Sequence, residues 1–444
     1  MNQRQFLGWA AALALGVLPA ARGQQADSKV DAAFQKFWAA DSPAAAAKRA
    51  SDIEKSGVSF DEALRRLKAG RAYTAQKSGV VQLMNRTEDG AEHYYSVDIP
   101  EAYDPGRRYQ VRFQLHGGIG ARTDNKPRGN GEIGRLAGAE QIYVLPYAWE
   151  DAPWWGADQV LNLGAIVDAL KRTYNVDENR VVVAGVSDGA TGAYYIAMRD
   201  TTPYASFLPL NGFLMVLANR EIDDGRIFPN NLRNKPLFAV NGGRDPLYPT
   251  SDVEPFTRHL MNSGVTMEYH PQPDGEHNTR WWPEVKDVFE KFVSDHPRDP
   301  DPDRLTWEAA DAVHGRAHWL EINRFGKALG ENAAMSDVND VDASETGRFG
   351  VPAGRLFRGS KDAGRVDLER AGNTVKASTR GVTEFTLLLA AEKFDFSQPI
   401  VVIANGREVF HGRVERSVKT LLQRAARDND RTMLYAAELP VHLQ

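Results

Sequence analysis

The chain has 444 residues, of which 42% are apolar and 25% are charged, and its formal net charge is −5. This composition is that of an ordinary globular protein long enough for two domains, and the mild negative charge excludes nucleic acid as an expected partner. The sequence contains no cysteine, which excludes disulfides, thiol chemistry and a lipid-modified cysteine anchor.

The first 23 residues have the order of a secretory signal peptide. Arg4 precedes an apolar run from Phe6 to Leu18, and small residues follow up to Gly23. The run is too short to span a membrane comfortably, and the alternative is an apolar first helix of a cytosolic protein. We predict a signal peptide over residues 1–23, export to a bacterial periplasm or exterior, and no membrane association after cleavage. The absence of disulfides fits that location.

Residues 24–78 are predicted to form an N-terminal helical arm. Phe34 and Trp38 lie four residues apart in an apolar pattern of helical spacing, and Ser59 with Glu62 has the pattern of a capping box at the start of a helix. We expect this arm to pack on the residues that follow it.

Short apolar strands and helices alternate over residues 79–296. The expected strands are residues 80–84, 93–99, 109–115, 142–145, 180–184, 207–210, 236–240 and 266–269. The expected helices are residues 161–173, 190–198, 253–261 and 283–293. This alternation predicts an α/β domain with a mostly parallel sheet that is covered by helices on both faces.

A change of pattern follows this domain. Residues 297–303, rich in proline and aspartate, are predicted to form a solvated linker because they cannot continue a helix. Residues 304–444 are mainly strand-like, and Asn405-Gly406 is a strong signal for a β-hairpin. One helix is expected over residues 418–427. We interpret this region as a C-terminal β-sandwich domain.

The sequence Gly185-Val-Ser187-Asp-Gly189 lies between an expected strand and an expected helix. In that context it predicts a sharp turn that exposes the Ser187 hydroxyl as a nucleophile. The flanking glycines are needed because neighbouring backbone comes too close for side chains. The helix that follows presents free N–H groups and a partial positive charge, which favour a developing oxyanion.

A serine nucleophile needs a base, and the base needs an orienting carboxylate. Asp245 lies in a Gly-rich loop directly after the strand 236–240, and His277 lies in the loop after the strand 266–269. Alone, Asp245 could cap a turn and His277 could be a solvated loop residue. Their order after consecutive strands favours a catalytic triad of Ser187, Asp245 and His277.

The oxyanion hole requires two backbone N–H donors. One is expected from Asp188, the residue after the nucleophile. The other is expected from Gly118, because Leu115-His-Gly-Gly118 follows the strand 109–115 and glycine lets the backbone approach a substrate closely.

These motifs together resemble the α/β-hydrolase fold, most closely the secreted serine esterases of the polyhydroxybutyrate depolymerase and feruloyl esterase type. The resemblance covers residues 80–295 and rests on Leu115-His-Gly-Gly118, the turn at Ser187, the loop Gly243-Arg-Asp245-Pro-Leu-Tyr-Pro and the loop Gly275-Glu-His277. It implies hydrolysis of a small or polymeric ester through an acyl-enzyme, without a metal or an organic cofactor. Two residues depart from the pattern. Asp188 stands where a neutral side chain is more frequent, and Ala190 replaces a frequent second glycine.

Candidate substrate-binding residues come from two tryptophan pairs. Trp154-Trp155 lies in a loop rich in proline and glycine, and Trp281-Trp282 follows His277 within one helical turn. Adjacent tryptophans are not expected to be buried together on a regular element, so we expect contact with an aryl or sugar-linked ester. The alternative is packing of the loop that holds His277. His116, in the loop after the strand 109–115, is a further candidate.

Two other functions stay open at this stage. The first is a serine peptidase of the prolyl oligopeptidase type, which shares these motifs. The second is a non-catalytic protein that binds a carbohydrate or a partner through the β-sandwich. The sequence does not indicate the acyl group, the alcohol or the oligomeric state.

Overall fold

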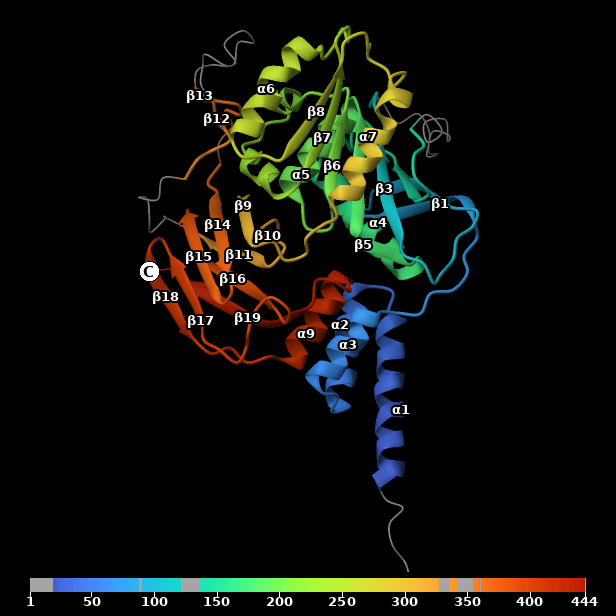
Figure 1. Ribbon diagram of the computed structural model, residues 1–444, viewed down its shortest axis with the longest axis vertical. Coiled ribbons are helices and arrows are strands. Elements are labelled where there is room, and N and C mark those ends of the chain that lie inside the picture. The colour runs from blue at the N-terminus through green and yellow to red at the C-terminus, as the bar shows by residue number, and fades with distance from the viewer. Residues whose placement is uncertain are drawn as a thin grey trace, which may run out of the picture.

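The computed structural model describes residues 19–87, 90–120, 136–326, 335–341, 354–359 and 361–443, with side chains from residue 28 onward. The predicted signal peptide falls mostly outside these residues, and helix α1 (Pro19–Trp38) begins before its predicted end. Figure 1 shows an α/β domain, a β-sandwich and a group of helices, the last built from both ends of the chain.

An eight-stranded sheet forms the centre of the α/β domain. Its strands lie in the order β1-β2-β4-β3-β5-β6-β7-β8. Strands β3 to β8 are parallel, while β1 and β2 pair in the antiparallel sense. The strands are β1 (Gly79–Arg86), β2 (Glu92–Ile99), β3 (Tyr109–Leu115), β4 (Ile142–Pro146), β5 (Val176–Val186), β6 (Ser206–Leu210), β7 (Leu237–Gly242) and β8 (Met267–Gln272). This strand order defines the α/β-hydrolase fold, so the predicted fold class is confirmed.

Helices cover both faces of this sheet. Helices α4 (Ala157–Thr173), α5 (Asp188–Arg199) and α6 (Thr250–Asn262) pack on one face, and α7 (Trp282–Asp295) packs on the other. Successive residues of β5 alternate between the two cores: Val181 and Val183 join the cluster with α4 to α6, whereas Val182 and Ala184 join the cluster with α7. A strand buried on both faces therefore reads as a continuous apolar run.

The C-terminal region is β-rich, as predicted. One sheet has the order β18-β17-β15-β14-β9 and the other has the order β10-β11-β16-β19. The strands are β9 (Arg304–Ala309), β10 (Arg316–Ala317), β11 (Leu320–Phe325), β14 (Gly364–Ala371), β15 (Thr374–Arg380), β16 (Val382–Ala390), β17 (Ile400–Ala404), β18 (Arg407–Gly412) and β19 (Tyr435–His442). Asn405 and Gly406 join β17 to β18 with φ of 50° and 78°, the left-handed backbone that a tight hairpin requires.

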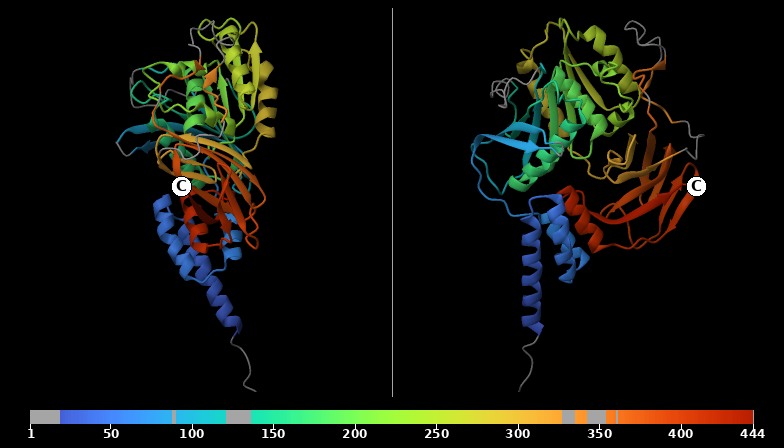
Figure 2. Two further views of the ribbon diagram at one scale, coloured as in Figure 1. Left: turned by 90° about the vertical axis from the view of Figure 1, so that its left-hand side faces the viewer. Right: turned by 180° about the vertical axis from the view of Figure 1, so that it is seen from behind.

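The helical group consists of α1, α2 (Pro43–Lys55), α3 (Phe60–Ala69) and α9 (Val418–Asp428). Ile53 of α2 and Leu67 of α3 share one buried cluster with Leu421 and Leu422 of α9. Both views in Figure 2 place this group below the α/β domain and beside the sandwich. The arm thus packs on residues that follow it in the chain, but its apolar face is covered by the distant helix α9 rather than by the α/β domain next in sequence, whose Arg172 donates a hydrogen bond to the carbonyl oxygen of Ala40 (2.7 Å). Short helices bury only one face, and the apolar face of α9 covers theirs.

A segment of the C-terminal region also returns to the α/β domain. Strands β12 (Asp340–Val341) and β13 (Gly354–Arg355) pair beside α6 (Figure 1). Val338 and Phe357, which flank this small sheet, are buried in the core of the α/β domain, and His259 Nε2 of α6 lies 2.8 Å from the carbonyl oxygen of Val338. Contacts between the two regions thus extend well beyond the linker.

The linker is only partly solvated. Pro297, Asp299 and Asp303 are exposed, as predicted, but two of its residues are buried, which the prediction missed. Arg298 is 3% exposed and Asp301 is 6% exposed. Arg298 donates hydrogen bonds to Asn179 Oδ1 (2.8 Å), to Asp430 Oδ2 (2.8 Å) and to the carbonyl oxygen of Thr202 (3.1 Å). Asn179 and Thr202 belong to the α/β domain and Asp430 to the C-terminal region. These hydrogen bonds offset the cost of desolvating the Arg298 guanidinium.

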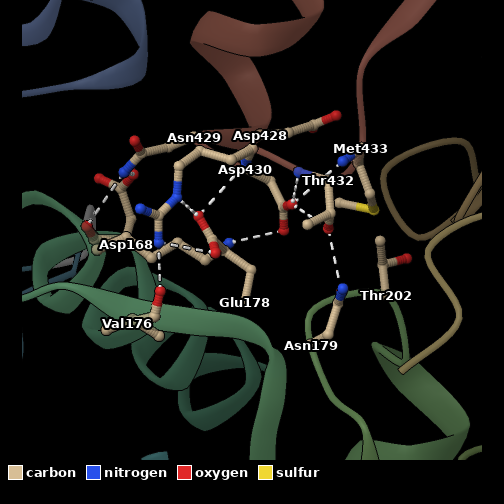
Figure 3. Close-up of polar contacts among 12 residues, drawn as sticks. Asp168, Val176, Glu178, Asn179, Thr202, Asp428, Asn429, Asp430, Thr432 and Met433 are labelled. Atoms are coloured by element: carbon tan, nitrogen blue, oxygen red, sulfur yellow. Dashed lines mark hydrogen bonds and ion pairs between the residues drawn. The ribbon is translucent and has the colours of Figure 1, made fainter. Parts of the chain in front are cut away.

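Five charged side chains form what we call the interface network: Lys171, Glu178, Arg298, Asp430 and Arg431. Lys171 lies 3.2 Å from Asp430 Oδ2, and Arg431 donates to Glu178 Oε2 at 2.9 Å. Figure 3 shows Glu178 and Asp430 with the polar contacts around them. Burial alone would raise the pKa of the Asp430 carboxyl, but the charges of Arg298 and Lys171 hold it well below its usual range. Asp430 therefore stays ionised within the interface.

The interface network gives a first stability prediction. Asp430→Asn leaves the buried cations Arg298 and Lys171 without their counterion, and we expect it to lower the free energy of unfolding by about 3–5 kcal/mol, measured by urea denaturation. The control is Glu254→Gln, which breaks the exposed ion pair of Glu254 with Arg258 and costs less than about 1 kcal/mol. Equal losses in the two variants would contradict an essential role of Asp430.

Asp301 gives a pH-dependent prediction. Among the described residues its Oδ1 has no hydrogen-bond partner, and burial raises its pKa to about 7, with a further contribution from the charge of Asp299. An unfolded aspartate loses its proton near pH 3.9, so the folded state binds more protons between about pH 4 and pH 7. Ionisation of Asp301 therefore lowers stability as the pH rises through this range.

We expect Asp301→Asn to remove this loss. The difference in free energy of unfolding, Asp301→Asn minus wild type, should grow by at least about 1 kcal/mol between pH 4 and pH 8. Denaturation at a series of pH values measures it. Glu254→Gln serves again as the control and should follow the wild-type profile. Parallel profiles for Asp301→Asn and the wild type would show that Asp301 does not titrate in this range.

Candidate active site

Ser187 occupies the turn between β5 and α5. Its φ of 56° and ψ of −116° lie in a region that non-glycine residues rarely adopt. A Cβ atom on Gly185 would lie 2.0 Å from the carbonyl oxygen of Gly189, and one on Gly189 would lie 2.2 Å from that of Leu115. The backbone passes so closely at this point that only glycine fits on either side of Ser187.

The structure brings Ser187, Asp245 and His277 together. His277 Nε2 lies 2.9 Å from Ser187 Oγ, and His277 Nδ1 lies 2.7 Å from Asp245 Oδ2. Asp245 and His277 follow β7 and β8, which run parallel to β5 and end at the same edge of the sheet, with β6 between β5 and β7. An ionised carboxylate only accepts hydrogen bonds, so we assign the proton to Nδ1 and leave Nε2 to accept the Ser187 hydroxyl.

Asp245 is held in place by the backbone as well as by His277. Its side chain is buried, and Oδ1 accepts hydrogen bonds from the N–H groups of Leu247 (2.8 Å) and Tyr248 (3.0 Å). These bonds use one carboxylate oxygen and leave the other for His277. The arrangement can therefore orient the imidazole and stabilise its protonated form.

The two expected oxyanion donors lie on either side of Ser187. Asp188 is the first residue of α5, and Gly118, with φ of 64°, lies in what we call the β3 loop (residues 116–120). A Cβ atom on Gly117 would lie 2.9 Å from Ser187 Cβ, so this loop passes directly against the nucleophile. No described residue accepts a hydrogen bond from the backbone N–H of Gly118 or of Asp188, which leaves both donors available.

His116 and Trp154 support the β3 loop. Both ring nitrogens of His116 are engaged by backbone, since Nε2 accepts from the N–H of Ala148 (3.1 Å) and Nδ1 lies 2.9 Å from the carbonyl oxygen of Gly117. Trp154 is 0% exposed and its indole N–H donates to the carbonyl oxygen of His116 at 2.8 Å. The prediction that Trp154 contacts a substrate is wrong, and the bonds of His116 favour a structural role for it.

The second tryptophan pair is also buried. Trp281 and Trp282 are each 5% exposed and pack in the core beneath α7, while Trp155 is half-buried against the other core. Trp281 is the N-cap residue of α7 and Trp282 is its first residue, and both rings reach the same core. The expectation that adjacent tryptophans leave one ring exposed is wrong for this pair.

Other aromatic residues lie beside the triad. The Tyr248 ring centroid is 5.7 Å from that of His277 and 6.3 Å from that of Phe213. Burial, and then the charges of Asp188 and Asp245, raise the pKa of the Tyr248 phenol. Sequence reasoning missed both residues, although the position of Tyr248, three residues after Asp245, was a usable signal.

The described residues contain no group of three or more histidine and acidic side chains that could hold a metal ion. None of the described helices has both the length and the apolar character needed to cross a membrane.

Comparisons with known proteins give relatives that are esterases. No family model matches the chain. The bifunctional acetylxylan esterase/xylanase XynS20E of Neocallimastix patriciarum is 24% identical over 220 residues, which are 47% of this chain and 31% of that protein. The "probable feruloyl esterase C" of Aspergillus terreus is 23% identical over 201 residues, 43% of this chain and 70% of that protein.

Solved structures that match part of the chain include esterases and dipeptidyl peptidases. A thermostable esterase matches with a TM-score of 0.41 and 20% identity, over 49% of this chain and 63% of that chain. A ferulic acid esterase matches with a TM-score of 0.37 and 18% identity, over 50% of this chain and 99% of that chain. The chain has the α/β-hydrolase fold by its own strand order. Its predicted resemblance to esterases of the feruloyl esterase type is confirmed by the curated relatives, although it spans less than a third of the first of them.

The close backbone approach at the Ser187 turn predicts how a glycine substitution there changes the free energy of unfolding. We expect Gly189→Ala to destabilise the protein by at least about 3 kcal/mol, because its Cβ would collide with backbone that cannot move independently of the sheet. The control is Gly164→Ala in α4, where a Cβ meets nothing within 4 Å and stability should rise by up to about 1 kcal/mol. Urea denaturation of both variants measures the difference. A Gly189→Ala protein as stable as the control would contradict the turn geometry.

Proposed function

We propose that this protein is a serine hydrolase that cleaves carboxylic ester bonds through an acyl-enzyme on Ser187. The observation that carries the proposal is the continuous hydrogen-bonded relay from Asp245 through His277 to Ser187 Oγ, with separations of 2.7 and 2.9 Å. The esterase relatives support an ester as the substrate class.

The proposed reaction has two halves. Ser187 Oγ attacks the ester carbonyl carbon while His277 Nε2 takes the hydroxyl proton, and the N–H groups of Gly118 and Asp188 stabilise the oxyanion that forms. His277 then gives its proton to the departing alcohol, which leaves the acyl group on Ser187. Water, deprotonated by the same imidazole, releases the acid and restores the serine. No cofactor enters this scheme.

The proposal predicts that Ser187→Ala lowers kcat by about 10³-fold or more, leaving only binding and oxyanion stabilisation. Hydrolysis of p-nitrophenyl esters, feruloyl esters and peptide anilides by purified wild type and variant measures this, together with labelling by a fluorophosphonate probe. Ser251→Ala, which removes an exposed hydroxyl bonded to Asp252, is the control and should keep rate and labelling.

The same panel separates the alternatives. Ester turnover with little turnover of anilides supports the proposal. Faster cleavage of the anilides would identify a peptidase instead, and an unlabelled Ser187 with no turnover of any substrate would favour a binding protein.

We also propose that the chain is exported, with residues 1–23 removed. The support is the order of charged, apolar and small residues before Gly23. Cleavage there would remove the first residues of α1, which begins at Pro19. N-terminal sequencing of the mature protein tests this, and a mature protein that keeps Met1 would contradict it.

A further inference from the structure

The carboxylate of Asp188 connects the two halves of the candidate oxyanion hole. Asp188 begins α5 directly after the nucleophile, and its Oδ2 accepts a hydrogen bond of 2.8 Å from the N–H of Ile119. Ile119 follows Gly118 in the β3 loop. The backbone of Asp188 therefore provides one N–H donor, and its side chain holds Ile119, the neighbour of the other donor, Gly118.

We infer that Asp188 is a positioning residue, whose carboxylate fixes the β3 loop against the N-terminus of α5 so that both N–H donors point to the same oxyanion. The inference rests on the proposed function. It concerns one of the two departures from the esterase pattern, the acidic side chain beside the nucleophile.

The β3 loop needs such an attachment because of its composition. Gly117 and Gly118 are consecutive glycines, which have the largest backbone freedom of all residues. Bonds to neighbouring loops hold the two ends of the β3 loop, since the Trp154 indole and the Ala148 N–H reach His116 and the Glu150 N–H donates to the Gly120 carbonyl oxygen at 3.0 Å. The bond from Asp188 acts in the middle of the loop and ties it to the helix that carries the other donor.

The hydrogen bond of Asp188 favours oxyanion binding, but its negative charge opposes it. Negative charge develops next to it when the oxyanion forms, and like charges at short range repel. The N-terminus of α5 and the Ile119 N–H stabilise the carboxylate in the resting enzyme. Its charge nevertheless contributes, after burial, to raising the pKa of the Tyr248 phenol, so its field extends into the site. Acceptor geometry and charge must therefore be separated experimentally.

Substitution by asparagine separates them. Asp188→Asn keeps an oxygen at the same place but removes the charge, whereas Asp188→Ala removes both. We expect Asp188→Ala to lower kcat by about 10- to 100-fold, less than the loss of a whole oxyanion donor, with KM changed less than about threefold. Asp188→Asn should recover kcat to within about threefold of the wild type.

A second readout does not depend on turnover. Amide hydrogen exchange, measured on fragments that cover the β3 loop, should be at least about tenfold faster in Asp188→Ala, because a charge-assisted hydrogen bond is lost. Asp188→Asn should restore the protection. The matched control is Asp61→Ala, which removes a first-turn carboxylate from the distant helix α3 and should change neither exchange in the loop nor kcat.

Three outcomes would overturn the inference. Unchanged exchange in Asp188→Ala would show that the carboxylate does not hold the loop. An equal loss of kcat in Asp188→Asn would show that the charge matters rather than the acceptor, and a higher kcat in Asp188→Ala would show that repulsion dominates. If Asp188→Ala does not fold, Asp188→Ser gives the same test, because the serine hydroxyl is one bond shorter than the aspartate carboxylate and does not reach the Ile119 N–H. Failure of the proposed function is distinguishable, because wild-type Ser187 would then resist the fluorophosphonate.

Discussion

The backbone crossing at Gly185 and Gly189 is the constraint on which the site depends. Because glycine at both positions leaves room for the crossing backbone, β5 and α5 meet closely enough that Ser187 takes a positive φ, which non-glycine residues rarely adopt. The strain is tolerated because the surrounding strands determine the position of every neighbouring atom. The Ser187 N–H donates to the carbonyl oxygen of Leu210 on β6, which ties the turn to the next strand. The turn at Ser187 is therefore held by the ends of three adjacent strands, β3, β5 and β6, rather than by one loop.

The rest of the molecule contacts the α/β domain at the start of β5 and at the end of α4. Glu178 lies near the start of β5 and Lys171 lies near the end of α4, and both pair with residues that follow α9. The sandwich and helical group thus contact the α/β domain away from the end of β5 that carries Ser187. Burying charges on both sides of this interface is costly unless each finds its partner, so the interface network specifies one relative placement of the parts. It acts on stability while leaving the chemistry to the other end of the sheet.

Local sequence signals predicted the strands, the helices and the three residues that meet at Ser187. They were sufficient because the turn at Ser187 and the loops at Asp245 and His277 each follow a recognisable strand, and parallel strands end at one edge. The sequence did not reveal the burial of Trp154, since its indole N–H is satisfied by a backbone carbonyl 38 residues away. The burial of Arg298 in the linker was missed for a similar reason. Arg298 looks solvated until Asp430, distant in sequence, is placed beside it.

The pairing of α1 to α3 with α9 has a consequence for the order in which the chain becomes structured. Helices α1 to α3 are synthesised long before the apolar residues that cover them, such as Leu421 and Leu422 of α9. Contacts between such distant segments form slowly, because a long loop must close before they are gained. Helices α1 to α3 therefore keep an uncovered apolar face until α9 has been synthesised. A fragment that ends before α9 would still present that face to chaperones and proteases.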